Sequence, residues 1–268
     1  MSAPGSGLLP AHVVVRTRDL ERVLAALENR QYAAAEAGDE WALHLDVAGV
    51  RTFRPRLTAN AADLRSAAAR AGIAAVAGWL RASPLPLGLG ATAAELLAPD
   101  GRWRTALAGL QQDARAAEPM LRALVGLGAG STPAGDDFVI GALAHAWVTR
   151  GGKAPLIAAM RLLGAELPAL TTAVGATYLR AAARGEFGSH LIAWVLALPR
   201  VSPPRALALA RRVAGHGATS GRDTVAGFVA AAEADDASRC SRCEPATPTR
   251  TFLDNFAIWT RLTDGPLI

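Results

Sequence analysis

Alternating apolar and polar positions mark the first part of the chain. Residues 12–16 form a short β-branched run. The segments 31–37 and 40–47 flank a Gly-Asp pair, and apolar side chains alternate along the second of them. Alternation with period two is typical of strands, and Gly-Asp between two such runs favours a hairpin. With a further strand candidate at 51–57, the pattern predicts a small β-rich unit over residues 1–58.

From Asn60 onward the apolar positions recur with helical spacing. Asn60 with Asp63 resembles a capping box, which begins a helix. The pattern predicts a larger, mostly α-helical domain over residues 59–234, so the predicted fold class is α+β. Residues 235–268 are largely polar, as expected of a flexible tail. Further helices, bounded by glycine or proline, are predicted at 101–117, 154–163, 168–184, 187–198 and 203–214.

Composition and charge narrow the class of function. The hydrophobic content of 51% and the mean hydropathy of +0.22 allow a substantial core. A net charge of +5 and a pI near 10.2 invite a nucleic-acid interpretation. However, Lys153 is the only lysine, and the arginines are scattered without aromatic residues interleaved for base stacking. We therefore expect no nucleic-acid partner; a nucleic-acid binder would instead show a steeply salt-dependent affinity.

Neither the apolar stretches nor the cysteines point to a membrane or a metal. No stretch reaches about 18 apolar residues, so no transmembrane helix is expected. Residues 1–16 lack the basic head and apolar core of a secretory signal, and we expect a cytoplasmic protein. Cys240 and Cys243 form a single C-x-x-C, and with no second pair and no nearby histidine a zinc site would be half-built. Their role is left open.

The segment Val125–Gly141 is the strongest candidate for chemistry. A glycine-rich loop with a Ser-Thr-Pro triplet runs into the start of an apolar helix, and the two acids Asp136 and Asp137 lie at that start. Unpaired backbone N–H groups and the helix dipole favour an anion there, while adjacent carboxylates would repel it unless a cation such as Mg²⁺ lay between them. The alternative is a turn followed by a capped helix. The substrate-binding candidates are Gly128, Gly130, Ser131, Thr132 and Gly135, and the metal candidates are Asp136 and Asp137.

A second segment, residues 215–227, repeats this pattern 86 positions later. Gly135-x-Asp137-x-Val139-x-Gly141 aligns with Gly221-x-Asp223-x-Val225-x-Gly227, and each copy follows a small, hydroxyl-rich loop. Ser220 with Asp223 also fits a capping box, which is the structural alternative for the second copy. The second loop adds Thr219, Ser220 and Gly221 as substrate-binding candidates.

We expect the two loops to line one shared cleft. Glycines one turn into each helix let the helices approach closely, and Asp137 and Asp223 should then lie within about 20 Å of one another, the reach of a small ligand. His216 and Thr219 should face Ser131 and Thr132 across a gap of about 5–10 Å. The candidate catalytic residues are Asp137, His216 and Asp223, with His190 and Glu186 as weaker candidates.

The run of Gly128, Gly130, Thr132, Pro133, Gly135, Asp136 and Asp137 resembles a bacterial family. It is similar to the G-x-G-x-T-P-x-G-D-D motif of the small subunit found with oxamate carbamoyltransferase in allantoin and purine catabolism. Ser131 stands where a bulkier apolar residue is commoner. Residues 178–187 and 216–223 resemble later blocks of the family, and the resemblance spans about residues 10–230.

The resemblance implies a subunit of a carbamoyltransferase-type enzyme. Its substrates would be small anionic metabolites such as oxamate, oxalurate and carbamoyl phosphate, and its partners would be larger subunits that resemble acyl-CoA synthetases. It implies no catalytic residues for this subunit. The alternative is a non-catalytic scaffold or partner subunit of the same kind of complex.

Overall fold

The computed structural model describes residues 32–37, 40–45, 56–98 and 113–240. The strand predicted at 12–16, most of the strand at 51–57, most of the helix at 101–117 and the end of the predicted tail lie outside these residues. A predicted hairpin is confirmed, since β1 (Tyr32–Ala37) pairs antiparallel with β2 (Glu40–Leu45).

The predicted α+β fold class, with its β-rich N-terminal unit, is wrong. From residue 56 to residue 98 and from 113 to 240 the described chain is helical, and strand-like contacts there are isolated bridges such as Arg56 to Glu186. A two-stranded hairpin has too little surface to bury a core of its own. The end of the strand predicted at 51–57 joins the helical core instead: Leu57 is buried, and its N–H donates to the Gly185 carbonyl at 2.9 Å.

The helical part begins and ends where the sequence supplies caps and glycines. The Asn60–Asp63 capping box is confirmed at the start of α2, and Ser66 and Thr172 cap α3 and α10. The α-helices are α2 (Ala61–Arg65), α3 (Ala67–Ala82), α4 (Ala93–Leu96), α6 (Ala114–Leu124), α7 (Ala134–Arg150), α8 (Pro155–Leu162), α9 (Leu167–Leu170), α10 (Ala173–Ala182), α11 (Ser189–Ala197), α12 (Pro203–Ala214) and α13 (Ser220–Cys240). Short 3₁₀ helices are η1 (Gly151–Lys153), η2 (Leu163–Ala165) and η3 (Leu198–Arg200).

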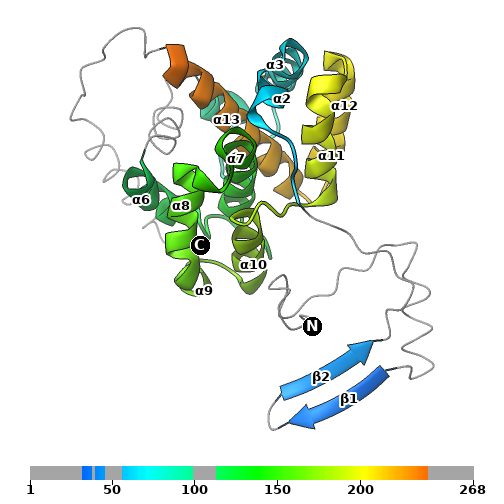
Figure 1. Cartoon of the computed structure of the whole chain (residues 1–268), viewed down its shortest axis with the longest axis vertical. Coiled ribbons are helices and arrows are strands. Elements are labelled where there is room, and N and C mark those ends of the chain that lie inside the picture. The colour runs from blue at the N-terminus through cyan, green and yellow to red at the C-terminus, as the bar shows by residue number, and fades with distance from the viewer. Residues whose placement is uncertain (1–31, 38–39, 46–55, 99–112, 241–268) are drawn as a thin grey trace.

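Helices α7 and α13 form the centre of the fold and run in the same direction (Figure 1). Thr132, just before α7, contacts Ser220 at the start of α13, and Arg150 at the end of α7 pairs with Asp235 late in α13. The two starts therefore lie at one end of the pair. Helix α13 runs to Cys240, beyond residue 234, where the helical domain was predicted to end.

Glycines allow the two backbones to touch where the helices cross. A Cβ on Gly141 would lie 1.9 Å from the Thr224 carbonyl oxygen, and a Cβ on Gly227 would lie 1.9 Å from the Phe138 carbonyl oxygen. The contact is reciprocal, as the 86-residue repeat predicts for two equivalent helices. It explains why these positions carry no side chain.

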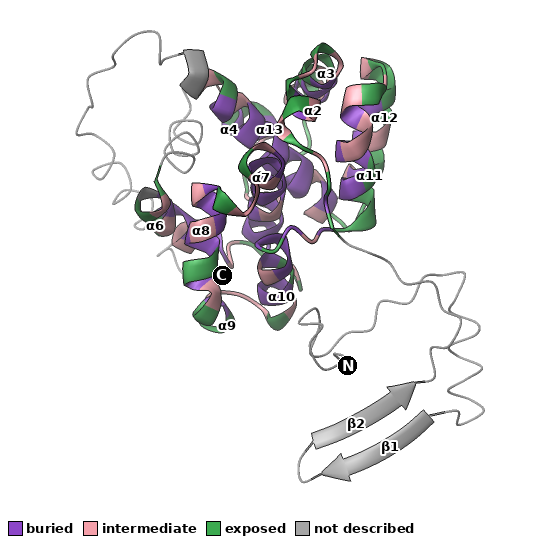
Figure 2. Ribbon diagram, viewed as in Figure 1, coloured by how far each residue is buried: buried purple, intermediate pink, exposed green. Residues whose placement is uncertain are grey.

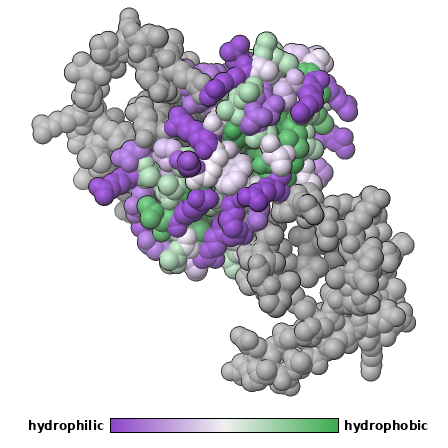
Figure 3. Space-filling view, in the orientation of Figure 1, coloured by the Kyte–Doolittle hydropathy of each residue, from purple (hydrophilic) through white to green (hydrophobic). Residues whose placement is uncertain are grey.

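The core surrounds this pair (Figure 2). Trp194 and Phe138 are fully buried, and the Trp194 ring lies 4.9 Å from the Phe228 ring. Helices α3 and α12 pack on α13, whereas α8 and α10 pack on α7. The outer face mixes hydrophilic and hydrophobic residues (Figure 3). None of the described helices is both long and apolar enough to span a bilayer.

Candidate functional site

The first glycine-rich loop connects α6 to α7 in a conformation that needs glycine. Gly126, Gly128 and Gly130 have φ angles of 83°, 104° and 105°, a region that side chains disfavour. Pro133 occupies the N-cap of α7 and makes no side-chain capping bond. The two acids at the start of α7 are therefore not its cap, and another reason is needed for each.

Asp136 anchors the loop. Its Oδ1 accepts from the Gly126 N–H at 2.8 Å, and its Oδ2 accepts from the Thr171 hydroxyl. Thr172 next to it donates to the Ser131 carbonyl at 2.6 Å, which ties the tip of the loop to the start of α10. Burial raises the pKa of Asp136, while these two donors lower it. Because both oxygens accept hydrogen bonds from the protein, this carboxyl group stabilises the conformation of the loop.

Asp137 and Asp223 face a different environment. Asp137 is 6% exposed and Asp223 is fully buried, yet one oxygen of each, Oδ2, has no hydrogen-bond partner. The other oxygen of Asp223 accepts from the Gly88 N–H at 3.0 Å. Buried polar atoms without partners are uncommon because they lose hydration without compensation. Among the described residues at this end of the helix pair, these two oxygens are the buried side-chain atoms that lack a hydrogen-bond partner.

Burial also changes the protonation of the two groups. It raises the pKa of Asp137 to about 7, against hydrogen bonds from Ser220 and Thr132 that lower it; the charge of Asp223 raises it further. Burial raises the pKa of Asp223 to about 6, against Thr219, Gly88 and Arg222, which lower it. Near neutral pH, Asp137 is thus poised between its proton-donating and proton-accepting forms.

The raised pKa values predict how stability depends on pH. An acid with a folded-state pKa above its unfolded value holds its proton longer when folded. Its contribution to stability is therefore complete below the unfolded pKa of 3.8 and declines as pH rises to about 7. We expect the free energy of unfolding of Asp137→Asn, relative to wild type, to increase between about pH 4 and pH 7, by up to about 1.4 kcal/mol per pH unit, and to level off above that. Urea titrations of both proteins across this range measure the difference, and a constant difference would contradict the raised pKa.

The loop that contains Gly88 completes the site, and the sequence pattern did not predict its place there. A Cβ on Gly88 would lie 2.6 Å from the Ala134 Cβ and 2.7 Å from the Thr219 hydroxyl oxygen, so Gly88 fits between the starts of α7 and α13. The signal was present: residues 88–91 and 126–129 both read Gly-Leu-Gly-Ala. Nothing in the local pattern shows that the two copies meet.

The structure brings some of the other predicted residues together and separates others. The hydroxyls of Thr132 and Ser220 lie 3.2 Å apart, so the two loops meet as the repeat predicted. At this point, between Thr132 and Ser220, the loops are in direct contact. Ser131 and Gly130 are exposed at the tip of the first loop. Gly128 lies against Ala134, where a Cβ would be 3.0 Å from its backbone nitrogen.

Two of the predicted glycines serve packing. A Cβ on Gly135 would lie 1.8 Å from the Leu124 carbonyl oxygen, and one on Gly221 would lie 1.9 Å from the Val213 carbonyl oxygen. Each start of a central helix thus presses against the helix before it.

His216 contacts the start of α11. Its ring centroid lies 4.1 Å from that of His190, which comes from the start of α11, with the two rings tilted by 52°, and both side chains are exposed. Burial, with the neighbouring charges of His216 and Arg212, lowers the pKa of His190. That His216 faces Ser131 and Thr132 across a gap of about 5–10 Å stays a prediction. Glu186 pairs with Arg184 at 3.2 Å.

The donor set does not suit a metal ion. Within the described segments, no group of three or more His, Cys, Asp or Glu side chains is arranged to hold one. Asp136, expected to share a cation with Asp137, directs its oxygens to Gly126 and Thr171.

Comparison with known proteins supplies a family. Residues 124–232 match the family described as oxamate carbamoyltransferase subunit AllH. This segment begins at the end of α6 and contains α7, the loops before α7 and α13, and the first part of α13. Over this segment the chain is similar to that family, in agreement with the resemblance of the motif. No solved structure matches the chain.

Proposed function

We propose that this chain binds the small anionic substrate of an oxamate carbamoyltransferase where the loops before α7 and α13 meet. The observation that carries the proposal is the pair of buried carboxyl groups, Asp137 and Asp223, each with one unpartnered oxygen. A ligand that hydrogen-bonds to both oxygens would offset the cost of burying them. Loops held by tertiary contacts are also common places for binding groups.

The raised pKa values are compatible with an anion. A protonated carboxyl group donates a hydrogen bond and does not repel a carboxylate or phosphate. With Asp136 bound to Gly126 and Thr171, the charge that faces a ligand is reduced without a divalent cation. Gly130 and Ser131 at the exposed loop tip, with the half-buried Thr132 beside them, supply further backbone and hydroxyl donors.

Asp137 is the group that we assign to proton transfer. In carbamoyl transfer to oxamate, the amide nitrogen attacks the carbamoyl carbon and a C–N bond forms. The bond from that carbon to the phosphate oxygen breaks, and phosphate leaves with the electron pair. The proton lost by the nitrogen passes to the Asp137 carboxylate. A base with a pKa of about 7 suits this step, since it is deprotonated often enough to accept and remains basic enough to bind the proton.

Isothermal titration of the full chain tests the binding step. The probes are oxamate, oxalurate, carbamoyl phosphate and inorganic phosphate, each with and without Mg²⁺. We expect at least one to bind without Mg²⁺, and Ser220→Ala to weaken it about fivefold through loss of a hydroxyl hydrogen bond. Ser202→Ala is the matched control, because that exposed serine precedes α12 and makes no side-chain capping bond.

Two other outcomes would change the assignment. Binding that requires Mg²⁺ would restore the metal-bridged interpretation of the loop. Binding of none of the four probes, combined with co-purification of the larger acyl-CoA-synthetase-like subunits, would favour the scaffold role. Exposed apolar side chains suited to a protein partner are present, namely Leu162 at 66% and Tyr178 at 39% exposure.

A further inference from the structure

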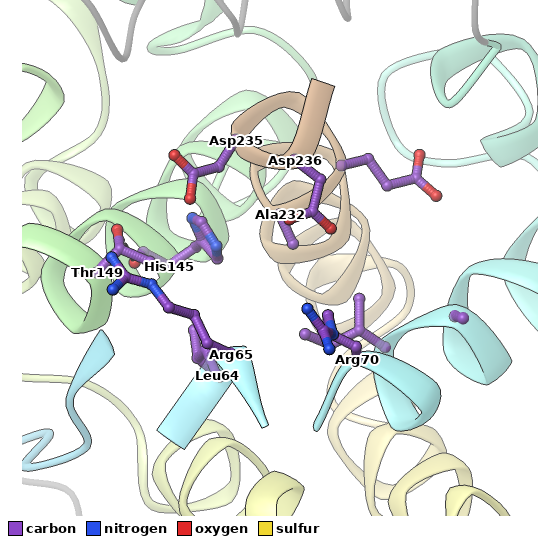
Figure 4. A pocket seen from close by; sticks show the side chains of 11 residues that line it. Leu64, Arg65, Arg70, His145, Thr149, Ala232, Asp235 and Asp236 are labelled. Carbon is purple, nitrogen blue, oxygen red and sulfur yellow. Dashed lines mark hydrogen bonds between the residues drawn. The ribbon is translucent and has the colours of Figure 1, made fainter. Parts of the chain in front are cut away.

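A cavity of about 330 Å³ lies at the other end of the central helix pair. His145 and Thr149 line it from the last turns of α7, and Ala232 and Asp236 line it from the later part of α13 (Figure 4). Helix α7 has 17 residues and is about 25 Å long at 1.5 Å per residue. The cavity is therefore separate from the loop site at the helix starts, and none of its lining residues belongs to that site.

Charged groups of opposite sign face one another across the cavity. Figure 4 shows Asp235 and Asp236 on the side of α13, and Arg65 and Arg70 on the side of α2 and α3, with open space between them. Leu64, Ile73, Ala74 and Ala232 supply apolar wall between the charges. Apolar walls with a few converging polar groups are typical of sites for small molecules.

Two of the acids are already paired inside the protein. Asp235, which is 4% exposed, receives Arg150 at 3.4 Å. Glu233 receives Arg81 at 2.7 Å, and Arg81 also donates to the Leu97 carbonyl. Their charges are largely balanced by these contacts, so they add little to the charge that a ligand would meet.

Three charged groups remain for a ligand. Arg65, Arg70 and Asp236 are exposed, and among the described residues none of the three makes an ion pair. Two guanidinium groups and one carboxylate leave a net charge of +1 on the lining. Guanidinium groups bind carboxylates through paired N–H donors, and a carboxylate accepts from an ammonium group.

We propose that this cavity binds an amino dicarboxylate, the class of aspartate and glutamate. The two carboxylates pair with Arg65 and Arg70, the ammonium group pairs with Asp236, and the aliphatic chain lies on Leu64 and Ile73. A single negative charge in excess on the ligand balances the single positive charge in excess on the lining. The proposal does not rest on the carbamoyl-transfer site.

Calorimetric titration of the full chain with L-glutamate and L-aspartate tests the proposal. We expect one of them to bind, and to bind more tightly than glutarate, which lacks the ammonium group, or 4-aminobutanoate, which lacks one carboxylate. Arg70→Gln should weaken binding at least about tenfold, as expected for loss of a charge-assisted pair. Arg205→Gln is the matched control, since it removes an exposed arginine on α12 that does not line the cavity.

Asp236→Asn separates recognition from general attraction. It should remove the preference for glutamate over glutarate while leaving glutarate binding intact or stronger. If neither amino acid binds at millimolar concentration, if glutarate binds wild type as tightly as glutamate does, or if Arg205→Gln weakens binding as much as Arg70→Gln, the proposal is wrong. Both substituted side chains are exposed, so the variants are expected to fold.

Discussion

Replacing Gly141 or Gly227 by alanine is expected to break the central helix pair. Each new Cβ would lie 1.9 Å from a backbone carbonyl oxygen of the opposite helix, of Thr224 or of Phe138. A backbone atom cannot rotate aside as a side chain can, so the helices must separate and lose packing along their length. We expect a loss of about 3 kcal/mol or more in the free energy of unfolding for each variant, measured by urea titration.

Gly78→Ala is the matched control for this prediction. Gly78 is an exposed glycine inside α3, and a Cβ there would meet nothing within 4 Å. Alanine favours helix over glycine, so this variant should be stabilised by about 0.5–1 kcal/mol. Gly141→Ala with the stability of wild type would contradict the close crossing of α7 and α13, and with it the meeting of their loops.

Asp137→Asn is expected to stop carbamoyl transfer while the protein stays folded. Asparagine has the shape of the protonated acid but cannot accept the proton from the attacking nitrogen. We expect the transfer rate of the assembled enzyme to fall about 10²- to 10⁴-fold, the usual contribution of a general base. Removing a buried carboxyl group with a pKa of about 7 should leave the Tm at pH 8 unchanged or higher.

The neighbouring substitution separates chemistry from structure. Asp136→Asn replaces one oxygen that accepts from Gly126 or Thr171 by a group that cannot accept, so it should lower the Tm. The Tm is thus expected to fall in Asp136→Asn and to stay unchanged or rise in Asp137→Asn. If Asp137→Asn lowers the Tm and Asp136→Asn does not, the roles that we assign to these two carboxyl groups are reversed.

The sequence predicted the relation between the two loops better than it predicted the fold class. The match of Gly141 with Gly227 and of Asp137 with Asp223 rests on identical local patterns, and identical patterns adopt equivalent positions at two helix starts. The hairpin over 32–45 was also recognisable. The prediction of a β-rich unit was wrong, because alternation identifies a strand but does not show that other strands complete a sheet around it.

The details of the site depended on contacts between distant segments. Gly88 lies 135 positions from Asp223, and its N–H bond to that carboxyl group has no local signature. Asp136 and Asp137 look equivalent in sequence, yet helical geometry turns one toward Thr171 and the other toward Ser220. His216 was chosen for its place in a loop, but its described partner is His190, on α11.

A crystal structure of the chain with oxamate bound tests the central claim most directly. The proposed site predicts the ligand between the starts of α7 and α13, with its polar atoms about 2.6–3.2 Å from Oδ2 of Asp137 and of Asp223. Calorimetry on the same protein establishes that oxamate binds in solution. Oxamate found elsewhere on the chain, with both oxygens still unpartnered, would contradict the account.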